Sequence, residues 1–542
     1  MRAQFEFGPL ERRGLFLGVR LGQLVVGLAT TVIVVAVFSL WPSPSGAGAA
    51  LVLIAGGAAV GCLPVLGRTP EQWAPVVAGY LHAGLVGDRR WLGPTQYRGH
   101  ELATGRSGAP DAVRDPAAPQ KRPAPTSARG PVADDGEQGD GAGEHRWVSA
   151  VRRVDAGDIH PPFLRGIELL AATWRQGDIG VVKDARRRTY VGVIAASGAG
   201  FALLDQGQKE RLLAQWGAVL SGLAREAGMV TRVQWLERTA PDDSESVVRH
   251  LGEHQALPGS SPFVRSYLAL LDEAGPQTQQ HEVLIALQVS ALRASPLIRQ
   301  LRSGVDVGAC EVLSRELDAL ATGLRRADVA VRGIFSPRML AAAFRYAVDP
   351  PAREHLAHRT AANPDLAGAS PRNAFPRRSL AMWSALQTEG AYHATYWVSE
   401  WPRAAVDTDW MAPLLLGTRC RRTVSVVMEP SPPAMALRRV EAARVDDATT
   451  QSLRERFGFR TTVRKRREEE NVARAEIELN EGHSVCRLSA YITVSARTRR
   501  ELDAACSDME QRASQARLDV RREYGSQDVA FTYTLPLCRG LR

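Results

Sequence analysis

The strongest constraint on the fold of this 542-residue chain is an uncharged stretch near its N-terminus. The run LGQLVVGLATTVIVVAVFSLW, from Leu21 to Trp41, contains no Asp, Glu, Lys or Arg. A helix rises about 1.5 Å per residue, so a run of this length reaches about 31 Å, roughly the thickness of a hydrocarbon core. We therefore predict a transmembrane helix over 21–41.

A second uncharged run, GAGAALVLIAGGAAVGCLPVL, covers 46–66 and is rich in Gly and Ala. Only residues 42–45 separate the two runs, which leaves room for nothing but a tight turn. The pair predicts a transmembrane helical hairpin over 21–66. Gly57 and Gly61 have the spacing with which small residues let two helix backbones approach closely, so we expect them on the packing face.

Basic residues flank the hairpin on both sides. Arg12, Arg13 and Arg20 precede it and Arg68 follows it, whereas the turn carries no charge. Because cytoplasmic flanks are enriched in basic residues, we expect a multi-pass protein of the cytoplasmic (inner) membrane with both termini in the cytoplasm, including segment 1–20. A cleaved signal peptide is the alternative, but the first run exceeds a usual signal core and no small-x-small site follows it.

The rest of the chain divides by composition. Region 67–102 contains a helix-forming segment, 67–84, with a Thr cap and an early proline, and we expect a juxtamembrane helix there. Region 103–146 lacks aromatic residues and is dense in Pro, Gly, Ala and charge, which predicts a disordered linker.

Beyond the linker, apolar patterns typical of strands and helices alternate. Strands at 190–196 and 229–236 enclose a helix at 208–227, which is a β-α-β unit, and a leucine stripe at 311–326 predicts a further helix. Near the C-terminus we expect a helix over 499–524 and a strand over 529–535. The fold class is α+β, built of α/β units, in a cytoplasmic body of about two subdomains, 147–350 and 379–542, divided by a linker at 351–378.

The sequence contains no standard nucleotide-binding motif. A Walker A loop needs Gly-Lys-Ser/Thr, and none of the four lysines follows a glycine. The turn at Gly198 and Gly200 has Leu203 where a dinucleotide fingerprint needs its third glycine. The six cysteines are scattered, without metal-ligand spacing. We therefore expect no cofactor, no metal and no enzymatic activity.

One short pattern supports a different reading. His250, Glu253 and His254 match H-x-x-E-H, in which two histidines bind zinc and the glutamate acts as base, so a membrane-tethered zinc hydrolase is an alternative. Gly252 inside the supposed helix and Pro258 just beyond it favour histidines in a solvated loop.

The formal net charge is +10, and nearly all basic residues are arginines, which favours anionic partners such as lipid head groups or nucleic acid. In the run 464–470 the first three basic residues each have a glutamate four positions on, which favours a self-neutralised surface helix over a nucleic-acid patch. The better exposed cluster is Arg186, Arg187 and Arg188, expected in a β-turn, where it can contact an anion. A membrane-anchored DNA-binding protein is therefore a second alternative.

Two parts of the chain resemble components of type IV secretion and conjugation machines. FEFGPLERRGLFLGVRLGQL, the two apolar runs and GRTPEQWAPVVAGYL resemble the PrgI-like hairpin subunit. RTYVGVIAASGAGFALLDQGQKERLLAQWGAVL with VTRVQWLER resembles the N-terminal domain of TraC/CagE-like, VirB-type secretion ATPases. The whole is similar to an actinobacterial family that joins both parts and ends in text like QDVAFTYTLPLCRGLR.

In that ATPase family a RecA-like motor follows the N-terminal domain, whereas this chain stops at Arg542. The resemblance thus implies a non-catalytic membrane scaffold that docks a separately encoded ATPase in type IV secretion or conjugative DNA transfer. Its implied partners are membrane lipid, that ATPase and other channel subunits. Further copies of this chain are also possible partners, and nucleic acid is an indirect one.

Overall fold

The structure is a computed structural model. It describes residues 21–62, 66–93, 147–155, 160–175, 177–197, 204–224, 228–241, 251–252, 258–274, 279–362, 367–402, 404–417, 420–432, 435, 438 and 486–541. Segment 1–20, the predicted linker 103–146, the Gly198 turn, the His250 pair and the run 464–470 lie outside the described residues.

Two apolar helices occur where the sequence predicts them, α1 (Leu21–Leu40) and α2 (Pro44–Cys62). They touch at Gly57, where an added Cβ would lie 2.4 Å from Thr30 Oγ1, so the contact needs a glycine; Gly61 lies one turn further along α2. Among the described residues one helical stretch, Gly22–Leu40, is long and apolar enough to cross a membrane, with a mean hydropathy of 2.3 and none of it buried. The apolar stretch of α2, Pro44–Val60, is shorter.

A helix, α3 (Pro70–Val86), occurs in the segment where the sequence predicts one, and its place beside a membrane stays a prediction. Pro70 occupies its first position and Gly87 ends it with a φ of 83°, a conformation that favours glycine. The expected capping contact is wrong in detail, because Thr69 adopts the extended cap conformation but its side chain makes no capping hydrogen bond.

One 14-stranded sheet organises the body, and every strand pair in it is antiparallel. The strands are β1 (Arg90–Leu92), β2 (Val148–Arg153), β3 (Ile167–Trp174), β4 (Gly177–Asp184), β5 (Thr189–Ser197), β6 (Val230–Pro241), β7 (Gln279–Ser290), β8 (Ala330–Ile334), β9 (Arg378–Ala381), β10 (Leu386–Thr388), β11 (Tyr392–Glu400), β12 (Arg421–Pro430), β13 (Cys486–Ala496) and β14 (Asp519–Arg522). The mixed helix-and-sheet class predicted from the sequence is confirmed.

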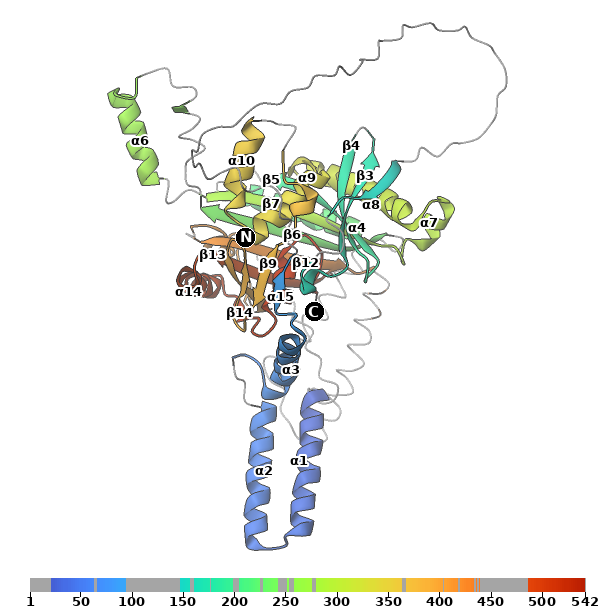
Figure 1. The fold of residues 1–542 in the computed structure, drawn as a ribbon, viewed down its shortest axis with the longest axis vertical. Helices are drawn as coiled ribbons and strands as arrows, with labels where there is room; N and C mark the ends of the chain where they lie inside the picture. The colour runs from blue at the N-terminus through green and yellow to red at the C-terminus, as the bar shows by residue number, and fades with distance from the viewer. Residues whose placement is uncertain are drawn as a thin grey trace, which may run out of the picture. The chain divides into compact units, whose positions relative to one another are not determined.

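The helices of the body are α4 (Gln206–Leu223), α6 (Pro262–Ala274), α7 (Ser295–Gln300), α8 (Val305–Arg326), α9 (Pro337–Val348), α10 (Ala352–Ala362), α11 (Ala412–Leu415), α14 (Arg499–Gln515) and α15 (Gln527–Phe531). Helices α8 and α14 pack on one face of the sheet and α9 on the other (Figure 1).

The strand order is symmetric about the contact between β6 and β12. Along the sheet it runs β1, β9, β10, β11, β13, β12, β6, β7, β5, β4, β3, β2, with β14 beside β11 and β8 beside β5. In residues 189–334, the first half, the chain runs β5, α4, β6, β7, α8, β8, with α6 inserted between β6 and β7 and the short α7 before α8. In residues 392–522, the second half, the described elements run β11, α11, β12, β13, α14, β14. Both halves are β-α-β-β-α-β arrangements with one strand order, so the body contains an internal structural duplication.

The strand register locates the centre of this duplication. In the first half β8 begins to pair with β5 at Ile194, and in the second half β14 begins to pair with β11 at Tyr396. The two halves meet in the β6–β12 ladder, which runs from Thr239 opposite Arg422 to Val233 opposite Met428. The midpoint of this ladder is the Leu236–Ser425 pair, and an approximate two-fold axis passes through it. The predicted subdomains share one continuous sheet, and their independence remains a prediction.

Each half buries a helix on the same face of the sheet. The predicted stripe on α8 is confirmed, and α14 contributes the corresponding stripe of the second half. The buried positions are Leu313, Leu317, Leu320 and Leu324 on α8, and Leu502, Cys506, Met509 and Ala513 on α14. Because successive strand residues face opposite sides, the other face carries a third core, formed with Leu340 and Phe344 of α9 and with the C-terminal Phe531, Leu535 and Leu537.

Three predicted elements differ in the structure. The helix expected over 499–524 ends at Gln515, Arg517 takes a φ of 57°, and the following residues form β14 against β11, so strand pairing overrides local helix pattern. The strand expected over 529–535 is α15 followed by a 3₁₀ turn over Thr532–Thr534. The range 351–378, predicted as a linker, contains α10.

The C-terminal segment is held at the centre of the sheet by Gln234 of β6. Its side-chain amide donates to Ser425 Oγ (2.8 Å) and to the carbonyls of Tyr533 and Leu535 (both 3.0 Å). Its side-chain oxygen accepts from the N–H groups of Leu537 (3.1 Å) and Cys538 (2.8 Å). Gln234 is fully buried, so these backbone groups have no access to water as a substitute.

We expect Gln234→Leu to lower the free energy of unfolding by at least about 3 kcal/mol, because it leaves several buried backbone groups unpaired. Urea unfolding of the full chain in detergent measures this. Gln300→Leu, at an exposed position of α7, is the matched control and should change stability by less than about 0.5 kcal/mol. Equal, small effects from both variants would contradict the role of Gln234.

His393 of β11 predicts a pH dependence of stability. It is fully buried between Thr388 Oγ1 (2.9 Å) and Ser495 Oγ (2.8 Å), and burial lowers its pKa from 6.5 to about 3. The stability that the neutral imidazole provides is complete above pH 6.5 and is lost as pH falls from 6.5 toward 3. Between pH 7 and pH 5 this loss is about 2 kcal/mol. Unfolding measured across this range should show the loss in the wild type and not in His393→Gln, whereas the exposed His355→Gln should keep it.

Candidate functional site

The basic cluster predicted from the sequence lies in a tight turn between β4 and β5. Residues 185–188 form the turn, and Arg188 has a φ of 53°. Asp184 holds the turn: it accepts the N–H of Arg187 at 3.1 Å and an ion pair from Arg539 at 2.6 Å. All three predicted arginines are exposed, as expected for a turn, but their side chains lie in different surroundings.

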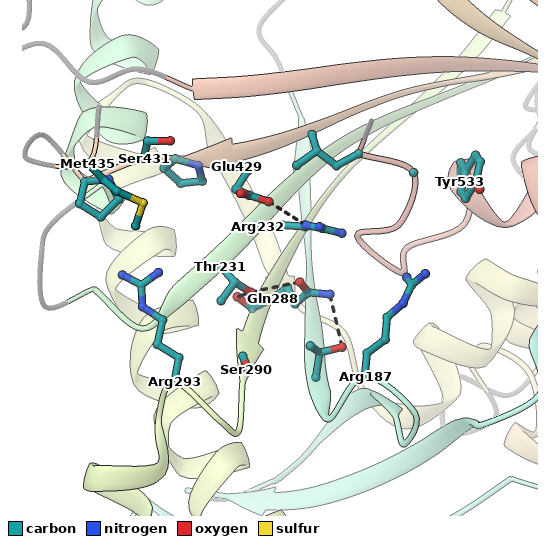
Figure 2. Close-up of a pocket in the computed structure, with 15 residues that line it drawn as sticks. Arg187, Thr231, Arg232, Gln288, Ser290, Arg293, Glu429, Ser431, Met435 and Tyr533 are labelled. Carbon is teal, nitrogen blue, oxygen red and sulfur yellow. Dashed lines mark hydrogen bonds and ion pairs between the residues drawn. The ribbon is translucent and has the colours of Figure 1, made fainter. Parts of the chain in front are cut away.

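Only Arg187 of the three faces a cavity, which we call the arginine pocket. It has a volume of about 520 Å³ and is lined by Arg187, Arg232, Arg293 and twelve further residues that include Glu429, Tyr533 and Leu541 (Figure 2). Arg187 comes from the β4–β5 turn, Arg232 from the start of β6 and Arg293 from the turn after β7. Neighbouring strand ends of the first half thus bring together arginines that are far apart in the sequence.

Hydrogen-bonded polar residues form one wall of the arginine pocket. Thr231 Oγ1 lies 3.1 Å from Gln288 Oε1, and the Gln288 amide donates to Thr189 Oγ1 at 3.4 Å (Figure 2). Gln288 and Thr189 are buried, so their orientation is set by the strands and not by a ligand. The wall is therefore present before anything binds.

The three arginines differ in how far they are already paired. Arg232 Nε donates to Glu429 at 3.3 Å and its Nη1 donates to the carbonyl of Cys538 at 3.2 Å. Arg187 Nε lies 3.9 Å from Asp184 Oδ2, at the limit of an ion pair. Within the described part of the chain, Arg293 has neither a hydrogen bond nor an ion pair to its side chain. Arg187 and Arg293 therefore keep most of their donor groups for another partner.

Charge around the arginine pocket is unbalanced. Arg487 approaches Glu429 to 3.6 Å and Arg539 pairs with Asp184, so five guanidinium groups meet two carboxylates. Guanidinium groups bind carboxylates and phosphates through paired N–H donors. The pocket can hold an anion, and the Cys538 thiol behind Arg232 stays protonated, because burial raises the pKa of Cys538.

The other residues selected from the sequence lie elsewhere. Gly57 packs against Thr30, as described above. Arg68 is buried and pairs with Glu523 at 2.8 Å. Arg12, Arg13 and Arg20 lie outside the described residues, as do both histidines of the zinc pattern. Within the described ranges, no group of three or more His, Cys, Asp or Glu side chains could hold a metal ion.

Comparison with known protein families and with curated proteins found no match for this chain.

Sequence reasoning missed Arg232, Arg293 and Glu429. Arg232 and Glu429 sit at the ends of strands that pair with each other, and nothing local marks them as site residues. One signal could have pointed to Arg293. It follows the end of strand β7 by three residues, and the ends of strands are where a chain leaves a sheet and side chains can gather around a site. Only the pairing order of the strands brings these residues beside Arg187.

Proposed function

We propose that this chain is a non-catalytic, multi-pass component of the cytoplasmic membrane that scaffolds a separately encoded ATPase in a type IV secretion or conjugative transfer system. In this proposal α1 and α2 form a transmembrane hairpin with both chain ends in the cytoplasm. The other proposed partners are membrane lipid, further channel subunits and other copies of the chain, with nucleic acid as indirect cargo.

The surface of α1 and α2 supports the membrane part of the proposal. Large apolar side chains along both helices are exposed, which is unfavourable in water and favourable in lipid. These side chains include Leu24, Leu28, Val32, Val35 and Phe38 on α1 and Leu51, Val52 and Ile54 on α2. No charged residue interrupts either helix.

The join between the apolar helices and the body carries the scaffold proposal. Trp73 of α3 stacks on Trp383 at 5.7 Å, and Tyr80 meets the same ring edge-on at 5.1 Å. Beside them the Arg68–Glu523 pair is buried on both sides, with 7% and 1% of the side chains exposed. A buried pair of this kind is strongly destabilising to break, so the join is stiff.

The chain also enters the sheet directly after α3. Strand β1 pairs with β9, and its residue Trp91 lies opposite Ser379. Nearby, the Arg521 guanidinium donates to the carbonyl of Gly67 at 3.3 Å. The segment that follows the apolar helices is therefore part of the second half of the body and not a flexible leash. Such a join suits a protein that positions a partner at a fixed place under the membrane.

The proposal predicts that a Walker-type ATPase of the transfer system co-purifies with the full-length chain from membranes. The purified chain alone should hydrolyse no ATP, since the activity belongs to the partner. A chain that hydrolyses ATP unaided, or that never recovers the ATPase, would contradict the proposal.

Trp383→Ala tests the contribution of the join. This variant removes the ring shared by Trp73 and Tyr80, so we expect DNA or protein transfer to fall at least about tenfold while the chain stays in the membrane. Trp174→Ala, which removes a ring stacked on Trp147 in the first half, is the control and should leave transfer unchanged. Equal transfer by both variants would show that a stiff join is not required.

A further inference from the structure

We propose that the arginine pocket binds a small organic phosphate of nucleotide size, with Arg187 and Arg293 donating to its anionic groups from opposite sides of the pocket (Figure 2). The ligand class follows from the donors, because paired guanidinium groups match phosphate oxygens in both charge and geometry. The body alone forms this pocket, so the proposal is independent of the membrane scaffold role.

The second half also has a cavity at its strand ends. It has a volume of about 610 Å³, and its lining includes Ala391, Arg421 and Ser495. Two carboxylates, Glu501 and Asp508, also line that cavity, and Asp508 accepts a hydrogen bond from Arg512 Nε at 2.9 Å. The lining of the arginine pocket has one carboxylate, Glu429, beside its three arginines, so its guanidinium groups are less fully compensated.

The size and lining of the pocket favour a small ligand over a nucleic-acid strand. A volume of about 520 Å³ is within the usual range of small-molecule sites. Pro430, Pro432 and Leu541 add an apolar wall on which the organic part of such a ligand can rest. A strand would need a continuous basic track with stacking platforms, whereas the Glu429 carboxylate interrupts the positive lining here.

The test is calorimetric titration of the full-length chain in detergent with three probes: ADP, inorganic pyrophosphate and a thymidine oligonucleotide. We expect ADP to bind at one site per chain and more tightly than the oligonucleotide. Arg187→Gln and Arg293→Gln should each weaken ADP binding at least about tenfold, the loss of one charge-assisted contact. Both residues are exposed, so the melting temperature should stay unchanged, which separates lost binding from lost folding.

Arg186→Gln is the matched control, because it removes the same charge from the same turn but does not line the pocket. It should alter ADP binding less than twofold. Three outcomes would overturn the proposal: no binding of any phosphate probe, an equal effect of all three variants, or tighter binding of the oligonucleotide with a steep salt dependence. The last outcome would indicate that the β4–β5 turn binds nucleic acid.

Discussion

The antiparallel pairing of β6 with β12 is the contact on which the architecture depends. It joins the two halves of the body from Arg422 opposite Thr239 to Met428 opposite Val233, and it places Trp235 against Val426 next to its midpoint. Trp235 and Val426 pack against the cores of both halves. One sheet therefore supports three cores, and neither half has to cover a free edge at this junction.

The same junction also explains the place of the C-terminal segment. On the opposite face of β6 and β12, Gln234 donates to Ser425, and both side chains bond to the carbonyl of Tyr533. The segment thus crosses the pseudo-symmetric centre and is bound by both halves. From there Arg539 reaches Asp184 beside the arginine pocket.

The two halves share a topology and differ in what they contact. The second half receives α3 and β1, so it carries the connection to the apolar helices. Both halves have a cavity at their strand ends, and that of the second half is lined by two carboxylates, Glu501 and Asp508, whereas the arginine pocket of the first half is lined by one, Glu429. In our proposal, the second half serves for attachment and the arginine pocket for a ligand.

Local pattern was sufficient for elements whose burial is continuous or regularly spaced. The apolar run of β5 and the leucine stripe of α8 were predicted because each shows its period within one segment. Strand β4 begins with Gly177 and Asp178, which resemble a turn, and it is a strand because β3 pairs with it along its whole length. The strand expected over 529–535 is helical, because Gln527 and Thr534 bond locally and to β11 and β13 instead of pairing as a strand.

The antiparallel order and the pocket could not be read from local pattern. The β-α-β unit of β5, α4 and β6 is present, but β7 inserts between its strands and makes every neighbour antiparallel. The ion pair between Arg232 and Glu429 joins residues that only this order brings together. Of the site, the sequence could indicate the basic turn at Arg187 and no more.

Hydrogen exchange of the full-length chain in detergent tests the central claim most directly. If β6 and β12 form one continuous sheet, peptides covering 230–241 and 421–430 will exchange as slowly as peptides covering the central strand β13, and they will lose protection together on unfolding. Fast exchange at β6 and β12 with slow exchange at β7 and β13 would show two separate sheets with free edges, and would contradict the account.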